Sequence, residues 1–422
     1  MFARLKDVIG RINPKPYHSR NRNFLTLFWL PLVVLVVGCS SQPLLGIAEP
    51  GTTLSSASTF GLYEVSTFDV YMVDDTVHLI VGGKMSTKDK QLKLSYTRSD
   101  DGGRTWQEPV GFGNLPETIA SRGNDIQLAA TGNNLLAVWQ TKGELPGMGP
   151  MISAVSNDNG KTWKQGANPA GNNLGDQSHL DLIADRNGHF HAVWLEDPEE
   201  NGYQSLRYAR SSSDGLHWSN AKTLDDSTCS CCWNKFALSP ENELSILYRD
   251  MKPRDMALLS SRDDGLSWQR VSTVGEFGWQ FDGCPHVGGS LAYADTEHPG
   301  DVSSLVWTGL EQKAGLYFLA SADHGKTWLH PQKIGNTAVH SDIAVYDGKR
   351  VAIWDEMEPE GSSIFYAKSQ LGENGWSTPK RLTQAADAAT HPRLVVTKSG
   401  FLALWTEKPR KQPNHLAWQL LE

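Results

Sequence analysis

Residues Ser321 to Trp328 read SADHGKTW, and this stretch is repeated along the chain. The copies share the pattern S-x-D-x-G-x-[ST]-W and occupy Ser99–Trp106, Ser156–Trp163, Ser261–Trp268 and, in a worn form, Ser211–Trp218 and Ser369–Trp376. In the worn copies Ser213 and Leu371 stand where the others have the aspartate. The copies recur at roughly 50–60 residues, a period typical of propeller blades rather than of a helical solenoid.

The residue types of the repeat are those of a tight turn between two strands. The aspartate carboxylate and the serine and threonine hydroxyls can hydrogen-bond the backbone of the turn, and glycine adopts a positive φ without a steric penalty. The tryptophan that follows is a large apolar side chain suited to packing against a neighbouring sheet. We therefore expect the repeat to shape the fold rather than to carry chemistry.

From about Ala48 onward, short alternating strands are separated by Gly, Asn and Asp turns, and no helix is predicted. The chain contains seven pairs of first and second strands but only six repeats. The seventh unit ends at Glu422 after its third strand, so we expect its fourth strand from the stretch near Thr52–Leu62. The sequence predicts an all-β fold, with residues 51–422 as a single β-propeller. Seven four-stranded antiparallel blades are favoured, with six as the alternative, and N- and C-terminal strands close the ring in one blade.

The first 38 residues differ from the rest. Six basic residues precede an apolar run, Phe24–Gly38, which is short for a membrane span of roughly 20 residues and typical of a signal peptide. Val36-Val37-Gly38-Cys39 resembles a bacterial lipobox, in which Cys39 becomes the lipidated first residue of a tether, residues 39–50. A signal anchor that happens to contain a cysteine is the alternative. Ser40-Ser41 is similar to the pattern of bacterial outer-membrane lipoproteins, so we expect a domain that faces the periplasm or the cell surface.

The charge balance limits the partners. The whole chain has 39 basic and 47 acidic side chains, and without its first 38 residues it keeps 33 basic and 46 acidic ones, a formal net charge of −13. Such an acidic domain repels phosphate backbones, so no nucleic acid partner is expected. Membrane contact is expected through the lipid anchor, because the domain offers no basic face to lipid.

A ligand site is expected at one end of the ring. Strand direction alternates within a blade, so the repeats share one face, while inner-strand starts and second-strand ends share the other and crowd the axis. The candidates for ligand binding at this mouth are His179, Asp181, His340, His391, Glu196 and Glu407. The alternative is that polar residues simply face solvent where strands emerge, which explains the acidic residues better than the histidines.

The cysteines also cluster at inner-strand starts. Cys229, Cys231 and Cys232 form a CxCC group, and Cys284 begins the next blade at the equivalent point. In an oxidising exported setting an even number of cysteines favours disulfides, with one bridge from the CxCC to Cys284 and a second bond inside the cluster. The alternative is a soft-metal site in which the four thiolates and His286 bind Cu(I) or Zn.

The repeats resemble the Asp-box, or BNR, repeats of sialidases and related propellers. The CxCC followed by Gly283-Cys284-Pro285 also looks like a subgroup of bacterial exported sialidase-like proteins. The resemblance implies a propeller that binds a ligand, either a glycan or a protein partner, at the axial mouth.

The resemblance to sialidases also implies catalytic residues. Sialidases use three arginines to clamp the sugar carboxylate, an Asp as acid and base, and a Tyr nucleophile paired with a Glu. The candidates here are Arg122, Arg249 and Arg393 for the clamp, Asp69 for the acid, and Glu196 or Glu407 for the base. Tyr248 lies beside Arg249, but strand alternation points it away from its neighbour. The Phe-Arg-Ile-Pro motif of the family is absent from the N-terminal part.

Three function classes follow from these observations. The first is a lipid-anchored propeller that binds a glycan or a protein, the second is a glycoside hydrolase of the exo-sialidase type, and the third is a protein that binds Cu or Zn. No other cofactor is expected, because the chain has no Walker loop, dinucleotide fingerprint, HExxH motif or nucleophile elbow.

Overall fold

A computed structural model describes residues 55–116, 118, 126–143, 149–172, 176–197, 204–373, 375–384 and 388–421. The chain divides into the units Met1–Thr52 and Thr53–Glu422, and the described residues belong to the second. The expected signal segment, the lipidation site Cys39, the tether and the candidate Arg122 lie outside the described residues. Within the described part, no helix has the length and apolar character needed to span a membrane.

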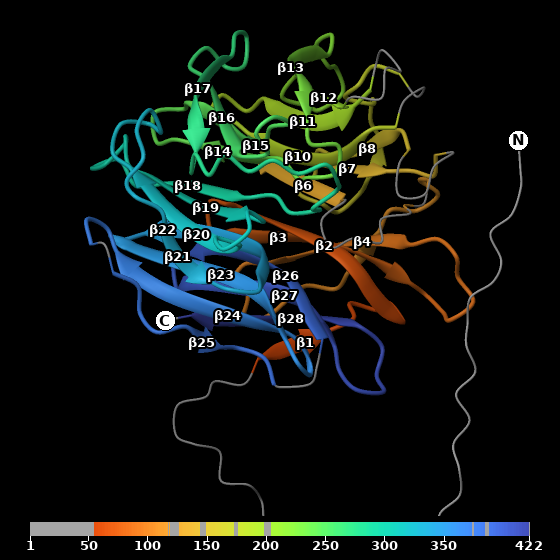
Figure 1. Ribbon diagram of the computed structural model, residues 1–422. Helices are drawn as coiled ribbons and strands as arrows, with labels where there is room; N and C mark the ends of the chain where they lie inside the picture. The colour runs from red at the N-terminus through yellow and green to blue at the C-terminus, as the bar shows by residue number, and fades with distance from the viewer. Residues whose placement is uncertain are drawn as a thin grey trace, which may run out of the picture. The chain divides into compact units, whose positions relative to one another are not determined.

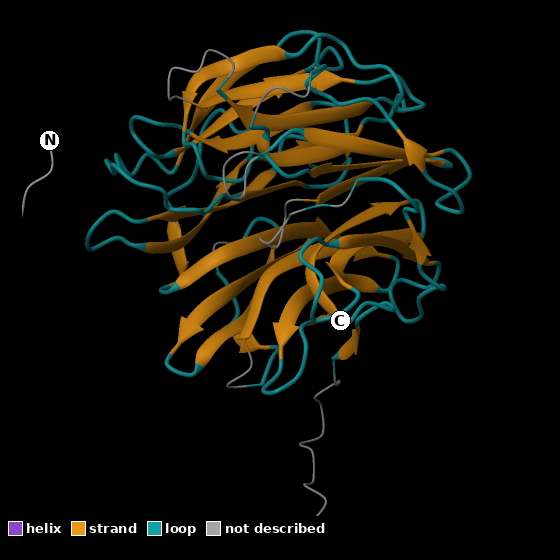
Figure 2. Ribbon diagram, turned by 90° about the vertical axis from the view of Figure 1, so that its right-hand side faces the viewer, coloured by secondary structure: helices purple, strands orange, loops and turns teal. Residues whose placement is uncertain are grey.

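The described chain folds into seven four-stranded antiparallel sheets, numbered here as blades 1 to 7. Blade 1 contains β2 (Glu64–Val73), β3 (Thr76–Lys84), β4 (Lys93–Ser99) and β5 (Val110–Gly111). Blade 2 contains β6 (Ile126–Thr131), β7 (Asn134–Gln140), β8 (Met151–Ser156) and β9 (Lys164–Gln165). Blade 3 contains β10 (Ser178–Ala184), β11 (Phe190–Glu196), β12 (Gln204–Arg210) and β13 (Lys222–Thr228). Figure 2 shows strands and loops without helices.

The remaining blades follow in chain order around the ring. Blade 4 contains β14 (Lys235–Leu238), β15 (Leu244–Arg249), β16 (Met256–Ser261) and β17 (Gln269–Val274). Blade 5 contains β18 (Ser290–Tyr293), β19 (Val302–Thr308), β20 (Gly315–Ser321) and β21 (Gln332–Gly335). Blade 6 contains β22 (Ala338–Tyr346), β23 (Lys349–Glu358), β24 (Gly361–Gln370) and β25 (Lys380–Arg381). Blade 7 contains β26 (Ala388–Thr397), β27 (Gly400–Lys408), β28 (His415–Leu421) and β1 (Ser56–Ser58).

The two ends of the described chain meet in blade 7. Strand β1 pairs with β28 in antiparallel register, with Ser56 opposite Trp418 and Ser58 opposite Leu416. Figure 1 shows the red N-terminal strand beside the blue C-terminal one. This pairing supplies the missing fourth strand, because the seventh unit has only three strands of its own. The predicted seven-blade ring, closed by its terminal strands, is confirmed.

The repeats form the turns that the sequence predicts. In blade 2 the Ser156 hydroxyl donates to Asp158 Oδ1 at 2.8 Å, and the Gly160 N–H donates to Ser156 Oγ at 2.9 Å. The Thr162 hydroxyl and N–H donate to the two oxygens of Asp158 at 2.6 and 2.9 Å. The hydroxyl bond, followed by the N–H bond, lowers the pKa of Asp158 to about 2. The carboxylate therefore holds the turn closed.

The glycines of the turns also allow neighbouring blades to pack closely. A Cβ at Gly160 would lie 2.0 Å from Cε1 of Tyr96, a residue of β4 in the preceding blade. The Tyr96 hydroxyl lies 2.7 Å from His78 Nδ1, and its ring lies 5.4 Å from that of Trp163. The repeat thus packs its own glycine and tryptophan against the blade before it.

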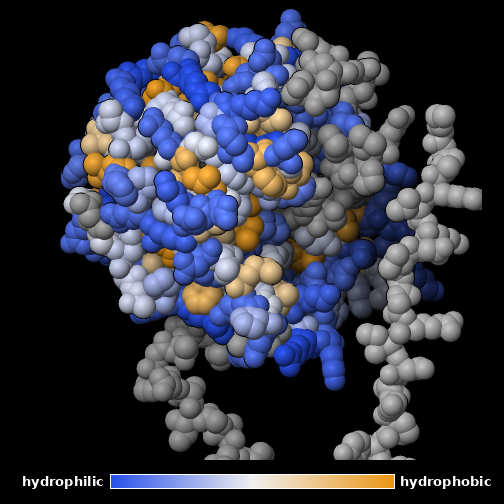
Figure 3. Space-filling view, in the orientation of Figure 1, coloured by the Kyte–Doolittle hydropathy of each residue, from blue (hydrophilic) through white to orange (hydrophobic). Residues whose placement is uncertain are grey.

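The surface drawn in Figure 3 shows no clustering of apolar side chains among the described residues. On the face drawn in Figure 3 most side chains are hydrophilic and the apolar ones are scattered. Large exposed apolar residues, such as Leu266, Leu329 and Met357, lie far apart in the sequence. The distinctive chemistry of the fold is therefore expected near the axis.

Replacing Gly160 by Ala should destabilise the protein far more than replacing Gly171. Both glycines have positive φ, 82° and 74°, but space around Gly171 is open. We expect Gly160→Ala to lower the free energy of unfolding by about 2–4 kcal/mol, from backbone strain plus overpacking, and Gly171→Ala by about 1 kcal/mol. Urea denaturation of both variants measures the difference, and equal losses would show that close packing on Tyr96 is unimportant.

Candidate functional site

The mouth ends of the inner strands are interrupted by β-bulges. The ladder register shifts between Val65 and Thr67, Ser178 and Asp181, Ala338 and Ser341, and Thr390 and Arg393. A bulge adds a residue to one strand and turns side chains away from the regular alternation. The candidates His179, His340 and His391 lie in three of these bulges, and His179 and His391 have left-handed φ values of 52° and 55°.

These histidines gather around Trp233, which lies two residues before the start of β14. The ring centroid of Trp233 lies 5.2 Å from that of His179, 6.0 Å from that of His340 and 6.1 Å from that of His391. The rings of His340 and His391 stack at 3.8 Å. The structure thus brings three predicted residues together. Sequence reasoning missed Trp233 as a site residue, although it occupies the same point of its blade as the histidines.

Asp355, on β23, supports the stacked pair. Its Oδ2 lies 2.7 Å from His340 Nδ1, and it accepts the backbone N–H groups of His340 and His391 at 2.9 and 3.1 Å. Burial, followed by repulsion from His340, lowers the pKa of His391 to about 3, so this ring is neutral near pH 7. Burial opposes ionisation of Asp355, but His340 and His391 bring its pKa below the usual value.

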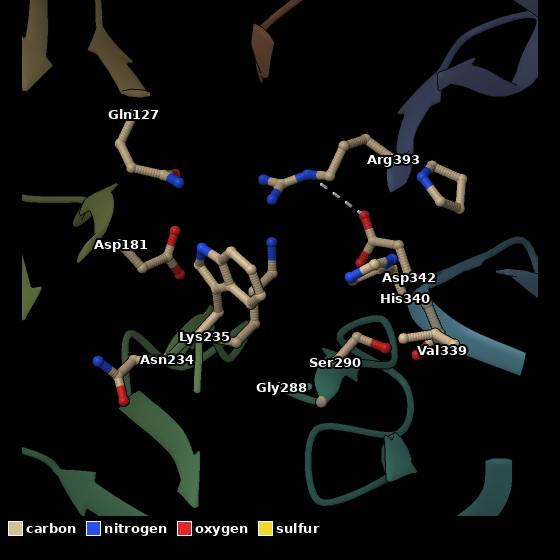
Figure 4. Close-up of a pocket in the computed structure, with 14 residues that line it drawn as sticks. Gln127, Asp181, Asn234, Lys235, Gly288, Ser290, Val339, His340, Asp342 and Arg393 are labelled. Atoms are coloured by element: carbon tan, nitrogen blue, oxygen red, sulfur yellow. Dashed lines mark ion pairs between the residues drawn. The ribbon is translucent and has the colours of Figure 1, made fainter. Parts of the chain in front are cut away.

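Below the histidines a ring of polar residues surrounds the axis. It consists of Asp69, Gln127, Asp181, Lys235, Ser290, Asp342 and Arg393, one from each inner strand. Figure 4 shows the charged ends of Arg393 and Lys235 pointing to the centre of the pocket, with Asp181 and Asp342 on either side. Arg393 Nη2 lies 2.9 Å from Asp69 Oδ1, and its Nε lies 3.7 Å from Asp342 Oδ2.

The aspartates of this axial ring also join neighbouring blades. Asp69 accepts the backbone N–H of Leu128 at 2.8 Å, and Asp342 accepts that of Leu394 at 3.0 Å. Asp181 makes the same bond to Phe236. Burial raises the pKa of Asp69 to about 6, although Arg393 opposes the shift. The structure therefore gives the predicted site residues Asp69, Asp181 and Arg393 a structural task in addition to their place at the mouth.

The mouth cavity contains buried polar atoms that have no hydrogen-bond partner among the described residues. These atoms are Trp233 Nε1, Asn234 Oδ1 and Ser290 Oγ. The cavity volume, about 40 Å³, exceeds the roughly 10–15 Å³ that one water molecule needs. Asp181, Lys235 and Arg393 also line a second axial cavity of about 560 Å³. The mouth cavity therefore has room for small polar groups.

The cysteine cluster lies at the rim of the mouth. Cys229 and Cys232 form a disulfide, which confirms the bond expected inside the cluster. Cys231 is a buried free thiol and Cys284 an exposed one, so the expected bridge from the cluster to Cys284 is not formed. One donor atom each from Cys231, Cys284 and His286 lies within 4.8 Å of the others. Burial, followed by hydrogen bonding with Cys284, raises the pKa of the Cys231 thiol to about 12.

Among the described residues, three groups have ligand atoms close enough to share a metal ion and contain no cysteine that is bonded in a disulfide. They are Cys231, Cys284 and His286; His340, Asp355 and His391; and Asp185, His189 and Asp264. The first group offers thiols and an imidazole, which suit Cu(I) or Zn. Cys229 and Cys232 are expected to contribute less, because their disulfide leaves no thiolate.

The family model of BNR repeat-like domains matches residues 63–277, about half of the chain. The chain belongs to the BNR repeat-like family. No curated protein sequence matches this BNR repeat-like protein. The match confirms the predicted resemblance to proteins with BNR repeats.

Several solved structures are similar to this BNR repeat-like protein. It is similar to Trypanosoma rangeli sialidase, with 16% identity, a TM-score of 0.46 and coverage of 74% of this chain and 55% of that one. The NanB sialidase of Streptococcus pneumoniae shows 13% identity, a TM-score of 0.46 and coverage of 87% and 68%. Polysaccharide lyase Uly1 shows 9% identity, a TM-score of 0.55 and coverage of 85% and 90%. The chain thus spans about half the length of the first sialidase.

Arg249, a predicted member of the arginine clamp, has its partners inside the fold. Its guanidinium donates to the backbone carbonyls of Val287 at 3.0 Å, Arg254 at 2.7 Å and Trp307 at 2.9 Å, and the residue is 2% exposed. These donors are therefore used inside the fold and do not face a ligand. Tyr248 points the other way, as strand alternation predicts, and its hydroxyl donates to Asp225 at 2.6 Å.

Glu196 and Glu407 also have structural partners. The indole N–H of Trp194 donates to Glu196 at 3.1 Å, and that of Trp405 donates to Glu407 at 2.9 Å. Both glutamates are at least nine-tenths buried. Their carboxylates thus accept from buried tryptophans of the same strand, and ligand binding by these glutamates stays a prediction. The Trp-x-Glu spacing was a usable signal, since residues two apart share a face of a strand.

Proposed function

We propose that this BNR repeat-like protein binds a hydroxyl-rich glycan over its axial mouth, with Trp233 as the platform. The observation that carries the proposal is the group of buried polar atoms of Trp233, Asn234 and Ser290 without partners among the described residues. Native proteins rarely leave buried polar atoms without a hydrogen-bond partner, so the mouth favours a polar ligand. A sugar hydroxyl can donate to Asn234 and accept from Trp233 at once.

The size and charge of the mouth narrow the class of glycan. A cavity of about 40 Å³ has room for hydroxyl groups of a sugar, while the sugar ring rests on the partly exposed Trp233. Three aspartates of the axial ring face one lysine and one arginine, and Arg393 already pairs with two carboxylates. A neutral glycan is therefore favoured over an anionic one.

An exo-sialidase activity has less support than binding. A clamp on the carboxylate of sialic acid needs arginines with available donors. Arg249 donates to three backbone carbonyls, and Arg393 is already paired with the carboxylates of Asp69 and Asp342. A protein partner at the mouth is the remaining alternative.

Replacing Trp233 by Ala should weaken glycan binding by about tenfold or more, the effect of losing roughly 1.4 kcal/mol of stacking and hydrogen bonding. Trp233→Phe should keep part of the affinity, because the ring remains while the indole N–H is lost. Leu329→Ala, at an exposed residue that directly follows a repeat, serves as the matched control. Calorimetry with neutral and sialylated oligosaccharides measures the affinities. No binding across both sets would overturn the proposal in favour of a protein partner.

A soft-metal function is the second candidate, favoured by the grouping of Cys231, Cys284 and His286. The three come from neighbouring blades, since Cys231 precedes β14 and the other two precede β18. Two thiolates and an imidazole supply three of the four ligands of a tetrahedral site for Zn or Cu(I). An exposed Cys284 leaves the fourth position accessible.

Metal analysis of the purified protein tests this candidate. We expect about one Cu or Zn per chain after reconstitution under reducing conditions, and loss of that metal in the Cys231→Ser/Cys284→Ser variant. His298→Ala, which changes an exposed histidine paired with Asp295, is the control. Equal metal content in all three proteins would remove the thiolate site from consideration.

We also propose that the propeller works as a bacterial outer-membrane lipoprotein tethered through Cys39. The support is the lipobox-like sequence before Cys39 and the disulfide Cys229–Cys232, which suits an oxidising compartment. In bacterial cells Cys39→Ser should move the protein out of the membrane fraction. Continued membrane association in that variant would instead favour an uncleaved signal anchor.

A further inference from the structure

Four sulfur atoms form a chain at the rim of the mouth. Cys229 and Cys232 are bonded, and the Sγ of the free Cys231 lies 3.9 Å from Cys229 Sγ. On its other side Cys231 Sγ lies within 4.8 Å of the Sγ of Cys284, whose thiol is exposed. The order from the interior to the surface is thus Cys232, Cys229, Cys231 and Cys284. Three of these residues are buried together, so the chain leads from the interior of the fold to solvent.

We infer that these four cysteines form a thiol–disulfide relay that moves one disulfide between the buried pair and the exposed thiol. In the first step Cys231 gives its proton to the nearby imidazole of His286 and attacks Cys229 Sγ, a Cys229–Cys231 bond forms, and Cys232 leaves as a thiolate that takes up a proton. In the second step the Cys284 thiolate attacks Cys231 Sγ, a Cys231–Cys284 bond forms, and Cys229 leaves as a thiolate. One disulfide is broken and one is made, so no external oxidant is needed.

Two neighbouring residues suit these steps. Arg254 Nη1 lies 3.1 Å from Cys229 Sγ and can stabilise the thiolate that leaves in the second step. The guanidinium is held in place, because Arg254 Nε donates to the carbonyl of Phe281. His286 lies within 4.8 Å of Cys231 and Cys284, and its imidazole can accept the proton of the Cys284 thiol.

The relay gives the protein an exchange activity toward dithiols. Once the bond has moved to Cys231–Cys284, a thiolate of a dithiol substrate attacks the exposed Cys284 Sγ, and Cys231 leaves as a thiolate. The second thiol of the substrate then attacks the mixed disulfide, which oxidises the substrate and leaves four protein thiols. The inference does not depend on glycan binding or on a bound metal. It implies, however, that the Cys231–Cys284 form cannot hold a soft metal through these thiolates.

Disulfide mapping of the unmodified full chain provides the first test. Cleavage after Lys222, Lys235, Arg270 and Lys313 places the CxCC in one peptide and Cys284 in another. Chelator-treated protein is incubated with a trace of reduced glutathione, quenched with acid, alkylated and digested. We expect both the separate peptides and the disulfide-linked pair to appear and to interconvert. If the linked pair never forms, the relay is overturned.

Glutathione trapping on variants provides the second test. Oxidised glutathione forms a mixed disulfide on Cys284, and Cys231 should resolve it in the wild-type protein. Cys231→Ser should therefore accumulate glutathione on Cys284 by about tenfold over wild type, as a thiol without its resolving partner does. Cys229→Ser/Cys232→Ser, which keeps the Cys231–Cys284 pair, is the matched control and should stay low. Equal accumulation in wild type and Cys231→Ser would overturn the relay even if the mapping were ambiguous.

Discussion

The structure depends on hydrogen bonds that cross from one blade to the next at the axis. Each sheet satisfies its own backbone, so neighbouring inner strands share no ladder and need another connection. Asp69, Asp181 and Asp342 provide it by accepting a backbone N–H of the following blade. These carboxylates are buried, which is costly unless they are paired. Arg393 offsets part of that cost by pairing with Asp69 and Asp342. The charged side chains at the axis therefore hold neighbouring blades together.

A second set of contacts acts at the opposite face. There the repeats place a glycine and a tryptophan on the preceding blade, as Gly160 and Trp163 do on Tyr96. The two sets thus join neighbouring blades at opposite ends of the ring. The mouth can then accommodate irregular strands, left-handed histidines and unpaired polar atoms without loss of the ring.

The sequence predicted the fold well because the information is local. Ser156, Asp158 and Thr162 bond within one turn, so their spacing alone reveals the geometry. The site was predicted only in part, because partners distant in sequence decide each role. Glu196 and Arg249 were correctly placed near the mouth end of their strands but bind a tryptophan and three carbonyls. Trp233 and Asp355 were not among the predicted site residues, since their neighbours His340 and His391 come from other blades or strands.

The closure of blade 7 has a consequence for how the chain reaches its folded state. Ser56 pairs with Trp418, 362 positions later, so this contact has nearly the largest sequence separation that the propeller allows. Contacts of this kind form late, because the loop between the partners must be ordered first. During synthesis β1 waits as an unpaired strand until β28 is made. The short length of β1, three residues, limits the exposed edge that could pair with another chain during that interval.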